Sequence, residues 1–353
     1  RFRPGMASVE LNERERQVLA AVIRSYVETA EPAGSRTVSR RFGLGVSPAT
    51  IRNTMSDLEE KGFLFHPHTS AGRIPTDKAY RVCVNELMLV TPLDRSERQH
   101  LQKEIGQGTA TLESILRRAA LCLGVLTQEL GVALGPRLEE TVLTRLELVR
   151  LSSERLMLVL SLRGGAMRTI FIEVRGEIGD DALAEVQTVL NERLRGLTLS
   201  AIRGSLGVRL RDAGTSTDTA ELLNIFLQEG EQLFEAPSPS EGDAVVLGQA
   251  SVLADQPEFA SGEQMRRLIE LTDTRTELAQ LLRSRKQSGG VQISIGTEHG
   301  ESLPGGLTVV TAEYTAGSLS GVIGVIGPTR MPYEKIIALV SHTSALVTEL
   351  LDG

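Results

Sequence analysis

The fold of the N-terminal part of this chain is decided by one segment, SPATIRNTMSDL, which runs from Ser47 to Leu58. Ser47 is a residue type that caps helices, and Pro48 follows it where proline suits the first helical turn. Ile51, Met55 and Leu58 recur at the spacing i, i+4 and i+7, which places them on one side of a helix. The segment therefore predicts an amphipathic helix that begins at Pro48.

With the apolar side buried, this helix presents polar side chains on its other side. Thr50, Arg52, Asn53 and Ser56 point outward near its start. Such side chains form hydrogen bonds with base edges in the major groove of DNA, and the amino end of a helix favours phosphate. We predict that Arg52 and Asn53 contact bases and that Ser47 and Thr50 contact phosphate. A helical hairpin with a solvated polar side would give the same pattern, so both interpretations stand at this point.

The flanking sequence predicts two helices before this one and a hairpin after it. Apolar residues recur at helical spacing from Leu11 to Glu28, and a short helix is expected from Ser35 to Phe42. Residues 63–65 and 74–76 have the character of two paired strands. This order of elements is that of a winged helix-turn-helix, a fold that inserts its recognition helix into the major groove.

The hairpin, or wing, supplies a second set of predicted DNA contacts. Its tip, residues 70–73, combines small residues with Arg73, which predicts a contact with the DNA backbone or the minor groove. His68 and Ser70 are expected to contribute less. The run from His66 to His68 also contains metal-ligand residue types. No cysteine or third histidine lies beside it, which favours a structural or phosphate-binding role in the wing.

Charge and composition narrow the class of partner. The 353 residues carry a net charge of −7, which divides into +2 for residues 1–94 and −9 for the rest. A weakly basic module on an acidic body argues against a protein that coats DNA along its whole length. Aromatic residues make up 3% of the chain and Trp is absent, which argues against binding of single strands by base stacking.

Cysteine content and hydropathy bear on cellular location. Cys83 and Cys122 are too few for a disulfide framework or a four-cysteine zinc site, and their scarcity is typical of a reducing compartment. Residues 1–5 lack the apolar run of a signal peptide, and no apolar stretch has the roughly 18 residues that span a membrane. We expect a cytoplasmic protein with no metal, no cofactor and no membrane segment.

The remaining sequence predicts a multidomain α+β protein. Strand-like runs occur at 146–152, 156–162 and 169–174, and again at 291–295, 307–315 and 320–326. A mostly helical stretch separates the two groups, which suggests one α+β domain interrupted by an insertion. We expect an N-terminal domain over residues 1–94, an α/β domain formed by 95–198 and 272–353, and an inserted domain over 199–271.

No arrangement of side chains in the sequence indicates catalysis. Residues 321–327 have glycine at every third position, which favours a closely packed strand over a dinucleotide-binding turn. Asp180 and Asp181 are adjacent at a predicted helix start, where acidic residues complement the helix dipole. His299 and His342 have no serine or cysteine nucleophile motif beside them. We expect that the protein is not an enzyme.

Four stretches of the chain have the form of family motifs: PHTSAGRIPTDK at 67–78, SPATIRNTM at 47–55, QPEF at 256–259 and GVIGPTRMPY at 324–333. They resemble the motifs of HrcA, the heat-inducible transcription repressor family of bacteria. Because the motifs lie near both ends, the resemblance covers nearly the whole chain. Ala79 stands where the family tends to have glycine.

This resemblance implies more than the pattern alone. It implies a winged-helix domain, a GAF-like α/β domain and an inserted dimerising segment within the latter. It further implies that a homodimer binds an inverted-repeat operator in double-stranded DNA and represses chaperone operons. A GroEL-type chaperonin is implied as the partner that keeps the repressor active until heat shock draws the chaperonin away.

Two other functions remain as alternatives. A metabolite-sensing regulator would use a pocket of the GAF-like domain, although no polar constellation recognisable as a ligand site occurs in the sequence. An enzyme fused to a DNA-binding domain would need a nucleophile and base, which the sequence does not supply. The apolar side of a predicted helix at 219–234 is either a dimer contact or part of a domain core; its residues are Leu222, Leu223, Ile225, Phe226 and Leu233.

Overall fold

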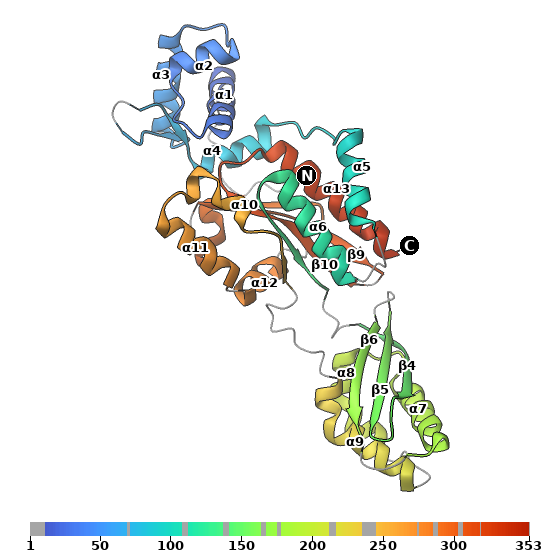
Figure 1. Ribbon diagram of the computed structural model, residues 1–353. Helices are drawn as coiled ribbons and strands as arrows, with labels where there is room; N and C mark the ends of the chain where they lie inside the picture. The colour runs from blue at the N-terminus through green and yellow to red at the C-terminus, as the bar shows by residue number, and fades with distance from the viewer. Residues whose placement is uncertain are drawn as a thin grey trace.

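The computed structural model describes residues 11–68, 71–107, 112–136, 141–163, 167–174, 178–211, 217–234, 245–273, 275–284, 289–302, 306–317 and 319–352. It shows an α+β protein in which a helical N-terminal region precedes a mixed α/β body (Figure 1). The strands of the described residues form a two-stranded, a five-stranded and a three-stranded sheet.

The N-terminal region has the predicted order of elements. These are α1 (Glu13–Thr29), α2 (Ser35–Phe42), α3 (Pro48–Glu60), β1 (Leu64–Phe65) and β2 (Ile74–Pro75). A capping box starts α1: the side chain of Asn12 accepts a hydrogen bond from the backbone of Glu15, and the Glu15 carboxylate accepts one from the backbone of Asn12. Val22, Ile51 and Leu58 are fully buried between the helices. β1 and β2 pair antiparallel, which confirms the predicted hairpin.

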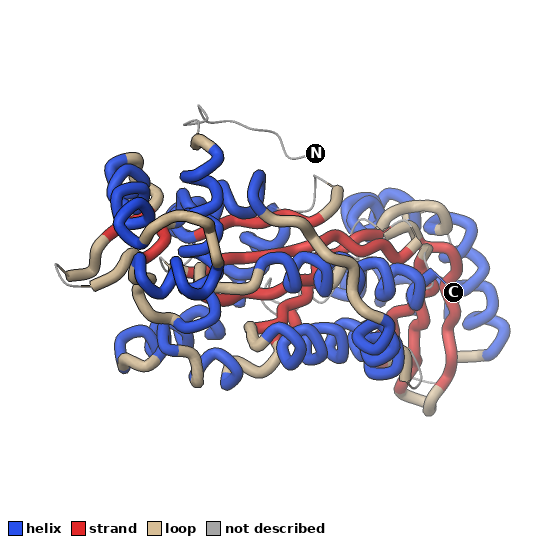
Figure 2. Tube along the Cα trace, turned by 90° about the horizontal axis from the view of Figure 1, so that it is seen from above, coloured by secondary structure: helices blue, strands red, loops and turns tan. Residues whose placement is uncertain are grey.

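A five-stranded antiparallel sheet forms the centre of the body. Its strands are β3 (Leu130–Leu134), β7 (Val245–Leu247), β8 (Val291–Ile295), β9 (Leu307–Ala316) and β10 (Leu319–Pro328), in the order β7-β3-β10-β9-β8. One face packs on α6 (Leu112–Thr127) and α13 (Tyr333–Asp352). The other packs on α10 (Ser251–Ala254), η3 (Pro257–Phe259) and α12 (Arg275–Ser284), with α11 (Gly262–Asp273) beside them. Figure 2 shows the strands between helices.

The glycine-rich run in β10 is a closely packed strand, as predicted. A Cβ atom on Gly324 would lie 2.0 Å from the carbonyl oxygen of Val310 on β9. One on Gly321 would lie 2.4 Å from the carbonyl oxygen of Leu134 on β3. These positions accept no side chain because the neighbouring strands approach too closely.

Strand β3 begins shortly after α6 ends, and its sequence alone does not distinguish it from a helix. The helix α6 ends at Thr127, and Gln128 takes the left-handed conformation with φ of 59°. All five residues of β3 are buried, so the strand has no alternation of polar and apolar residues. An apolar run buried on both faces has no period that distinguishes a strand from a helix.

The three-stranded sheet belongs to a separate part of the body, drawn at the bottom of Figure 1. Its strands β4 (Leu143–Arg150), β5 (Arg155–Leu162) and β6 (Met167–Glu173) pack on α7 (Asp180–Leu194), α8 (Leu199–Leu210) and α9 (Thr217–Phe234). These elements share one hydrophobic core, whereas the helices from 251 to 284 pack on the central sheet. The expected insertion boundaries of 199 and 271 are therefore wrong, and the inserted unit spans about 143–234.

The apolar side of α9 lies inside this inserted unit. Leu222, Leu223 and Phe226 are at most 2% exposed and belong to its core, and Ile225 packs against them. The side chain of Leu233 lies outside the described residues. The intradomain interpretation of this face is the one that the structure supports. Asp180 and Asp181 lie in the first turn of α7, as expected for residues that complement the helix dipole.

Candidate nucleic-acid interface

The outward side of α3 carries the polar side chains that the sequence predicted there. Arg52, Asn53 and Ser56 are exposed, and Thr50 is half-buried. On the opposite side Ile51, Thr54, Met55 and Leu58 are buried. A 13-residue helix thus presents an arginine and an asparagine from its first two turns without any cost to the core.

The start of α3 is capped by the predicted serine. The Ser47 Oγ atom accepts a hydrogen bond of 3.1 Å from the backbone N–H of Thr50, and the two hydroxyl oxygens lie 2.9 Å apart. Pro48 occupies the first helical turn. This arrangement keeps both hydroxyl groups at the amino end of the helix, where the helix dipole favours an anion.

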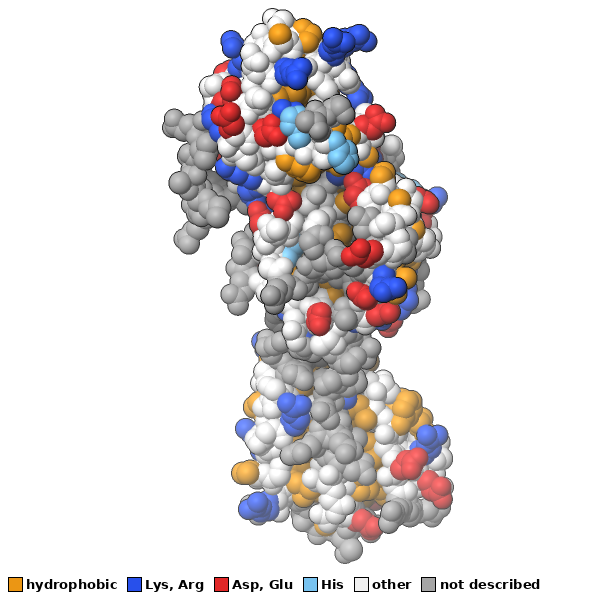
Figure 3. Space-filling view, turned by 90° about the vertical axis from the view of Figure 1, so that its left-hand side faces the viewer, with side chains coloured by type: hydrophobic (Ala, Val, Ile, Leu, Met, Phe, Trp, Pro, Cys, Tyr) orange, Lys and Arg blue, Asp and Glu red, His pale blue; other side chains and the backbone are white. Residues whose placement is uncertain are grey.

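The wing lies beside α3, and His68 is exposed on it. Ser70 lies outside the described residues. Figure 3 shows the side of the molecule on which basic, histidine and acidic side chains alternate over the N-terminal elements at the top. The surface is therefore mixed in charge, and a DNA contact there depends on particular side chains more than on a uniform positive patch.

Arg73 does not lie exposed at the wing tip, which corrects the sequence-based expectation. The residue is 9% exposed. Its Nη2 atom lies 2.8 Å from Oε2 of Glu59 on α3, and the other oxygen of that carboxylate lies 2.9 Å from Nδ1 of His66. Backbone hydrogen bonds to Ala33 fix the base of the wing. Arg73 and His66 thus fasten the wing to the last turns of α3.

The possible metal site at His66 and His68 finds no third ligand among the described residues, in which no group of three metal-binding side chains occurs. His66 is instead bonded to Glu59. Its position favours the structural role for this histidine.

The N-terminal elements contact the body through residues that the sequence did not single out. In α4 (Asp77–Val82), Arg81 forms a two-point ion pair with Glu298, in which Nε lies 2.8 Å and Nη2 lies 2.5 Å from the two carboxylate oxygens. The Nη2 atom also donates to the carbonyl oxygen of Ile293. Asp77 accepts hydrogen bonds from Thr297. Such partners are more than 200 residues apart in the chain, so no local pattern could have revealed them.

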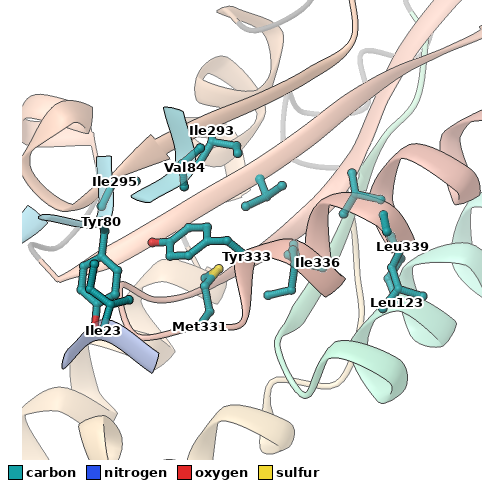
Figure 4. Close-up of a cluster of buried hydrophobic side chains, with 14 of the residues drawn as sticks. Ile23, Tyr80, Val84, Leu123, Ile293, Ile295, Met331, Tyr333, Ile336 and Leu339 are labelled. Carbon is teal, nitrogen blue, oxygen red and sulfur yellow. The ribbon is translucent and has the colours of Figure 1, made fainter. Parts of the chain in front are cut away.

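An apolar cluster accompanies these polar contacts. The ring of Tyr80 lies 5.8 Å from that of Tyr333 at the start of α13. Figure 4 shows both rings in one cluster with Ile23 of α1, Ile295 of β8 and Met331. The N-terminal region is therefore packed on the body by side chains from four separate segments.

A cavity of about 510 Å³ lies next to this cluster. Its walls come from α1, from the connection between α4 and α5 (Arg95–Ile105), and from the start of α13. Ile23, Leu87, Met88 and Met331 are among its apolar lining residues, and Arg24 lies at the same cavity. The cavity thus lies between the N-terminal elements and the body. None of the described helices is long and apolar enough to cross a membrane.

Comparison with known proteins agrees with this architecture. A model of the HrcA protein C terminal domain matches residues 113–337. The heat-inducible transcription repressor HrcA of Chlorobium luteolum is 40% identical over 98% of this chain and 99% of its own length. That of Geobacter sulfurreducens is 38% identical over 98% and 99%.

A solved crystal structure of a hypothetical protein has the same fold. The TM-score is 0.64 at 22% sequence identity, and the match covers 97% of this chain and 99% of the other. The family model and the full-length relatives together show that this chain belongs to the HrcA family of heat-inducible transcription repressors.

Proposed function

We propose that this chain represses transcription of heat-shock chaperone operons by binding an inverted-repeat operator as a homodimer. The N-terminal elements act as a winged helix-turn-helix, the five-stranded unit as a GAF-like domain, and the unit at 143–234 as the dimerising insertion. The observation that carries the proposal is the capped helix α3, which presents Arg52 and Asn53 outward from its first turns.

Each polar residue of this surface has a proposed role. Arg52 and Asn53 read bases in the major groove, and Ser56 lies on the same exposed side. Ser47 and Thr50 contact phosphate at the amino end of α3. Two wing residues, His68 and Ser70, contact the DNA backbone. Arg73, which the structure buries, holds the wing in place for those contacts.

The dimer supplies the two-fold symmetry that an inverted repeat requires. Half-sites about 34 Å or a multiple of it apart need two recognition helices in fixed relation. The inserted unit offers a partly exposed apolar face for this purpose: Val149, Met157 and Phe171 are register partners across β4, β5 and β6. Val149 and Phe171 are exposed, because the buried side of the same sheet faces α7–α9.

Heat acts on this repressor by lowering the amount of chaperonin that is available to it. The core is mostly aliphatic, the chain has 34 glycines, and Cys83 and Cys122 are free thiols. A multidomain chain of this kind exposes apolar surface as it folds and depends on a GroEL-type chaperonin for its active state. Other unfolded clients draw the chaperonin away on heat shock, and the repressor is lost from DNA.

Two experiments test the proposal. Footprinting on the chaperone promoters of the same genome should protect an inverted repeat, with equal protection of both half-sites. Purified protein given a heat pulse should recover operator binding only when chaperonin is added. Full binding before and after the pulse without chaperonin would contradict the heat mechanism and leave repression itself in place.

Metabolite sensing is a second candidate, and the cavity of about 510 Å³ beside α1 favours it. Its volume is within the range of small-molecule sites, which often lie between domains. A metabolite screen by thermal unfolding tests this function. A ligand present at 100 times its dissociation constant should add about 2.7 kcal/mol to the free energy of unfolding.

A further inference from the structure

Arg330 joins three segments that lie far apart in the chain. Its Nη1 atom donates a hydrogen bond of 2.9 Å to the carbonyl oxygen of Val27, in the last turn of α1. Its Nε and Nη2 atoms bond to the two oxygens of Glu258 in η3, with Nη2 at 3.0 Å. Arg330 of the body thus binds the carboxyl end of α1 in the DNA-binding region.

The helix α1 needs such a partner. The last carbonyl groups of a helix have no partner within it, and a cation there complements the helix dipole. No basic residue occurs in the last turn of α1 itself. Arg330 supplies from the body the positive charge that this helix end lacks, and Glu258 orients the guanidinium by its two-point bond.

The interface beside Arg330 is incompletely packed and incompletely hydrogen-bonded. The Tyr80 hydroxyl group is buried and has no hydrogen-bond partner among the described residues. The cavity of about 510 Å³ opens between α1 and the start of α13, so part of the interface lacks apolar contact. Separation of the two parts would break the apolar contacts of the Tyr80 cluster, but it would hydrate the buried hydroxyl group and cost no packing across the cavity.

The connection between the two parts has the form of a hinge. The helix α4 changes at Cys83 into a π-helix, η1 (Cys83–Leu87), and then into extended backbone at Met88. Departures from α-helical geometry of this kind often mark functional sites and hinges. The covalent link thus allows rotation once the apolar cluster around Tyr80 and Tyr333 opens, and the polar contacts add to that cluster in fixing the orientation.

We propose that Arg330, oriented by Glu258, is a latch that fixes the DNA-binding region on the body and thereby sets the spacing of the two recognition helices in the dimer. The proposal rests on the proposed function. The pair Arg81–Glu298 remains as a tether at the hinge end of the interface. Release of the latch allows α1 and α3 to turn about that tether, so the chain still binds one half-site but no longer selects the half-site spacing.

The first experiment measures the orientation directly. Spin labels at Thr37→Cys in α2 and Val125→Cys in α6, both exposed positions, report the distance between the two parts. Labelled chain is mixed with excess unlabelled chain so that each dimer carries one pair. Burial raises the pKa of the Cys83 and Cys122 thiols to about 11, which slows their labelling, and chain without added cysteines gives the background.

Arg330→Gln should broaden the distance distribution. The double variant Arg330→Gln with Glu258→Gln should do the same without an unpaired, half-buried carboxylate, which guards against loss of folding. Arg330→Lys should also broaden it, because an ammonium group does not reproduce the fork that bonds to both partners. Arg117→Gln is the matched control, since Arg117 pairs with Glu113 on the exposed side of α6.

The second experiment measures operator binding while the half-site spacing is changed by one to three base pairs. The parent chain should lose affinity steeply away from the natural spacing, and the Arg330 variants should show a dependence at least fivefold shallower. A folded Arg330 variant with the parent's distance distribution and spacing dependence would overturn the latch. If the parent chain binds no operator but the Arg330 variants show a broadened distance distribution, the proposed function is overturned and the latch is supported.

Discussion

Arg52 is the residue on which base recognition is proposed to depend. It is exposed on α3 and no core contact requires it, so its replacement leaves the fold intact. Arg52→Ala should weaken operator binding by about 1–3 kcal/mol and relax specificity at one position of each half-site. Arg195→Ala, at an exposed arginine just after α7, is the control. Unchanged affinity and sequence preference in the Arg52 variant would show that α3 is not the recognition helix.

Arg73 permits a test of positioning against direct contact. Because Arg73 is bonded to Glu59, both Arg73→Gln and Glu59→Gln should lower the melting temperature of the N-terminal region and weaken operator binding together. A residue that touches phosphate would instead lower the slope of log affinity against log salt by about one. A lower salt slope in the Arg73 variant alone, with unchanged melting, would support contact with DNA.

Glu129 gives the molecule a dependence of stability on pH. The carboxyl group is 2% exposed, and burial raises its pKa well above the usual value of 4.5, although Gln256 donates a hydrogen bond of 3.1 Å to it. The pKa of Glu129 is therefore higher in the folded chain than in the unfolded chain. Its contribution to the free energy of unfolding is fully present below about pH 4.5 and is lost as the pH rises through the pKa of the folded state.

Glu129→Gln should therefore reduce the loss of free energy of unfolding that accompanies a rise in pH. Urea unfolding between pH 4.5 and pH 8.5 should show that the parent loses free energy of unfolding with rising pH more steeply than the variant. Glu192→Gln, at an exposed carboxylate of α7, should follow the parent. Parallel curves for the parent and the Glu129 variant would mean that the buried carboxyl group does not titrate differently in the folded state.

At the scale of elements, the close approach of β9 and β10 makes a prediction. A Cβ at Gly324 would lie 2.0 Å from the carbonyl oxygen of Val310, so Gly324→Ala forces the strands apart. We expect a loss of about 1–3 kcal/mol in the free energy of unfolding. Gly204→Ala in α8, where a Cβ meets nothing within 4 Å, should instead stabilise by about 0.5–1 kcal/mol. Denaturant unfolding of both variants checks the pair.

At the scale of the whole molecule, the three-stranded sheet is predicted to hold the dimer together. Phe171 is 60% exposed in a row of apolar residues, and a charge there would be buried without a partner in a dimer. Phe171→Glu should yield monomers by light scattering and lose operator binding. Val208→Glu, at an exposed apolar residue of α8, should remain dimeric. An intact dimer in the Phe171 variant, or after deletion of residues 143–234, would place the interface elsewhere.

The N-terminal region could be predicted because its signals are local. The cap at Ser47, the apolar spacing from Ile51 to Leu58 and the capping box at Asn12 each involve residues within one or two helical turns. A single helix is specified by such neighbours, so both its bounds and its exposed side follow from the sequence. The outward position of Arg52 likewise follows from residues within one or two helical turns of it.

The other features of the fold and of the interface were decided by contacts between segments that lie far apart in the chain. Arg73 is buried because Glu59 lies across from it, and Arg330 reaches Val27, 303 positions away. The strand β3 and the true insertion boundaries depend on which sheet a segment joins, and an apolar run such as Leu130–Leu134 would suit a helix or a strand equally. Local propensity is a weak preference, and the tertiary pairing that buries each side chain overrides it.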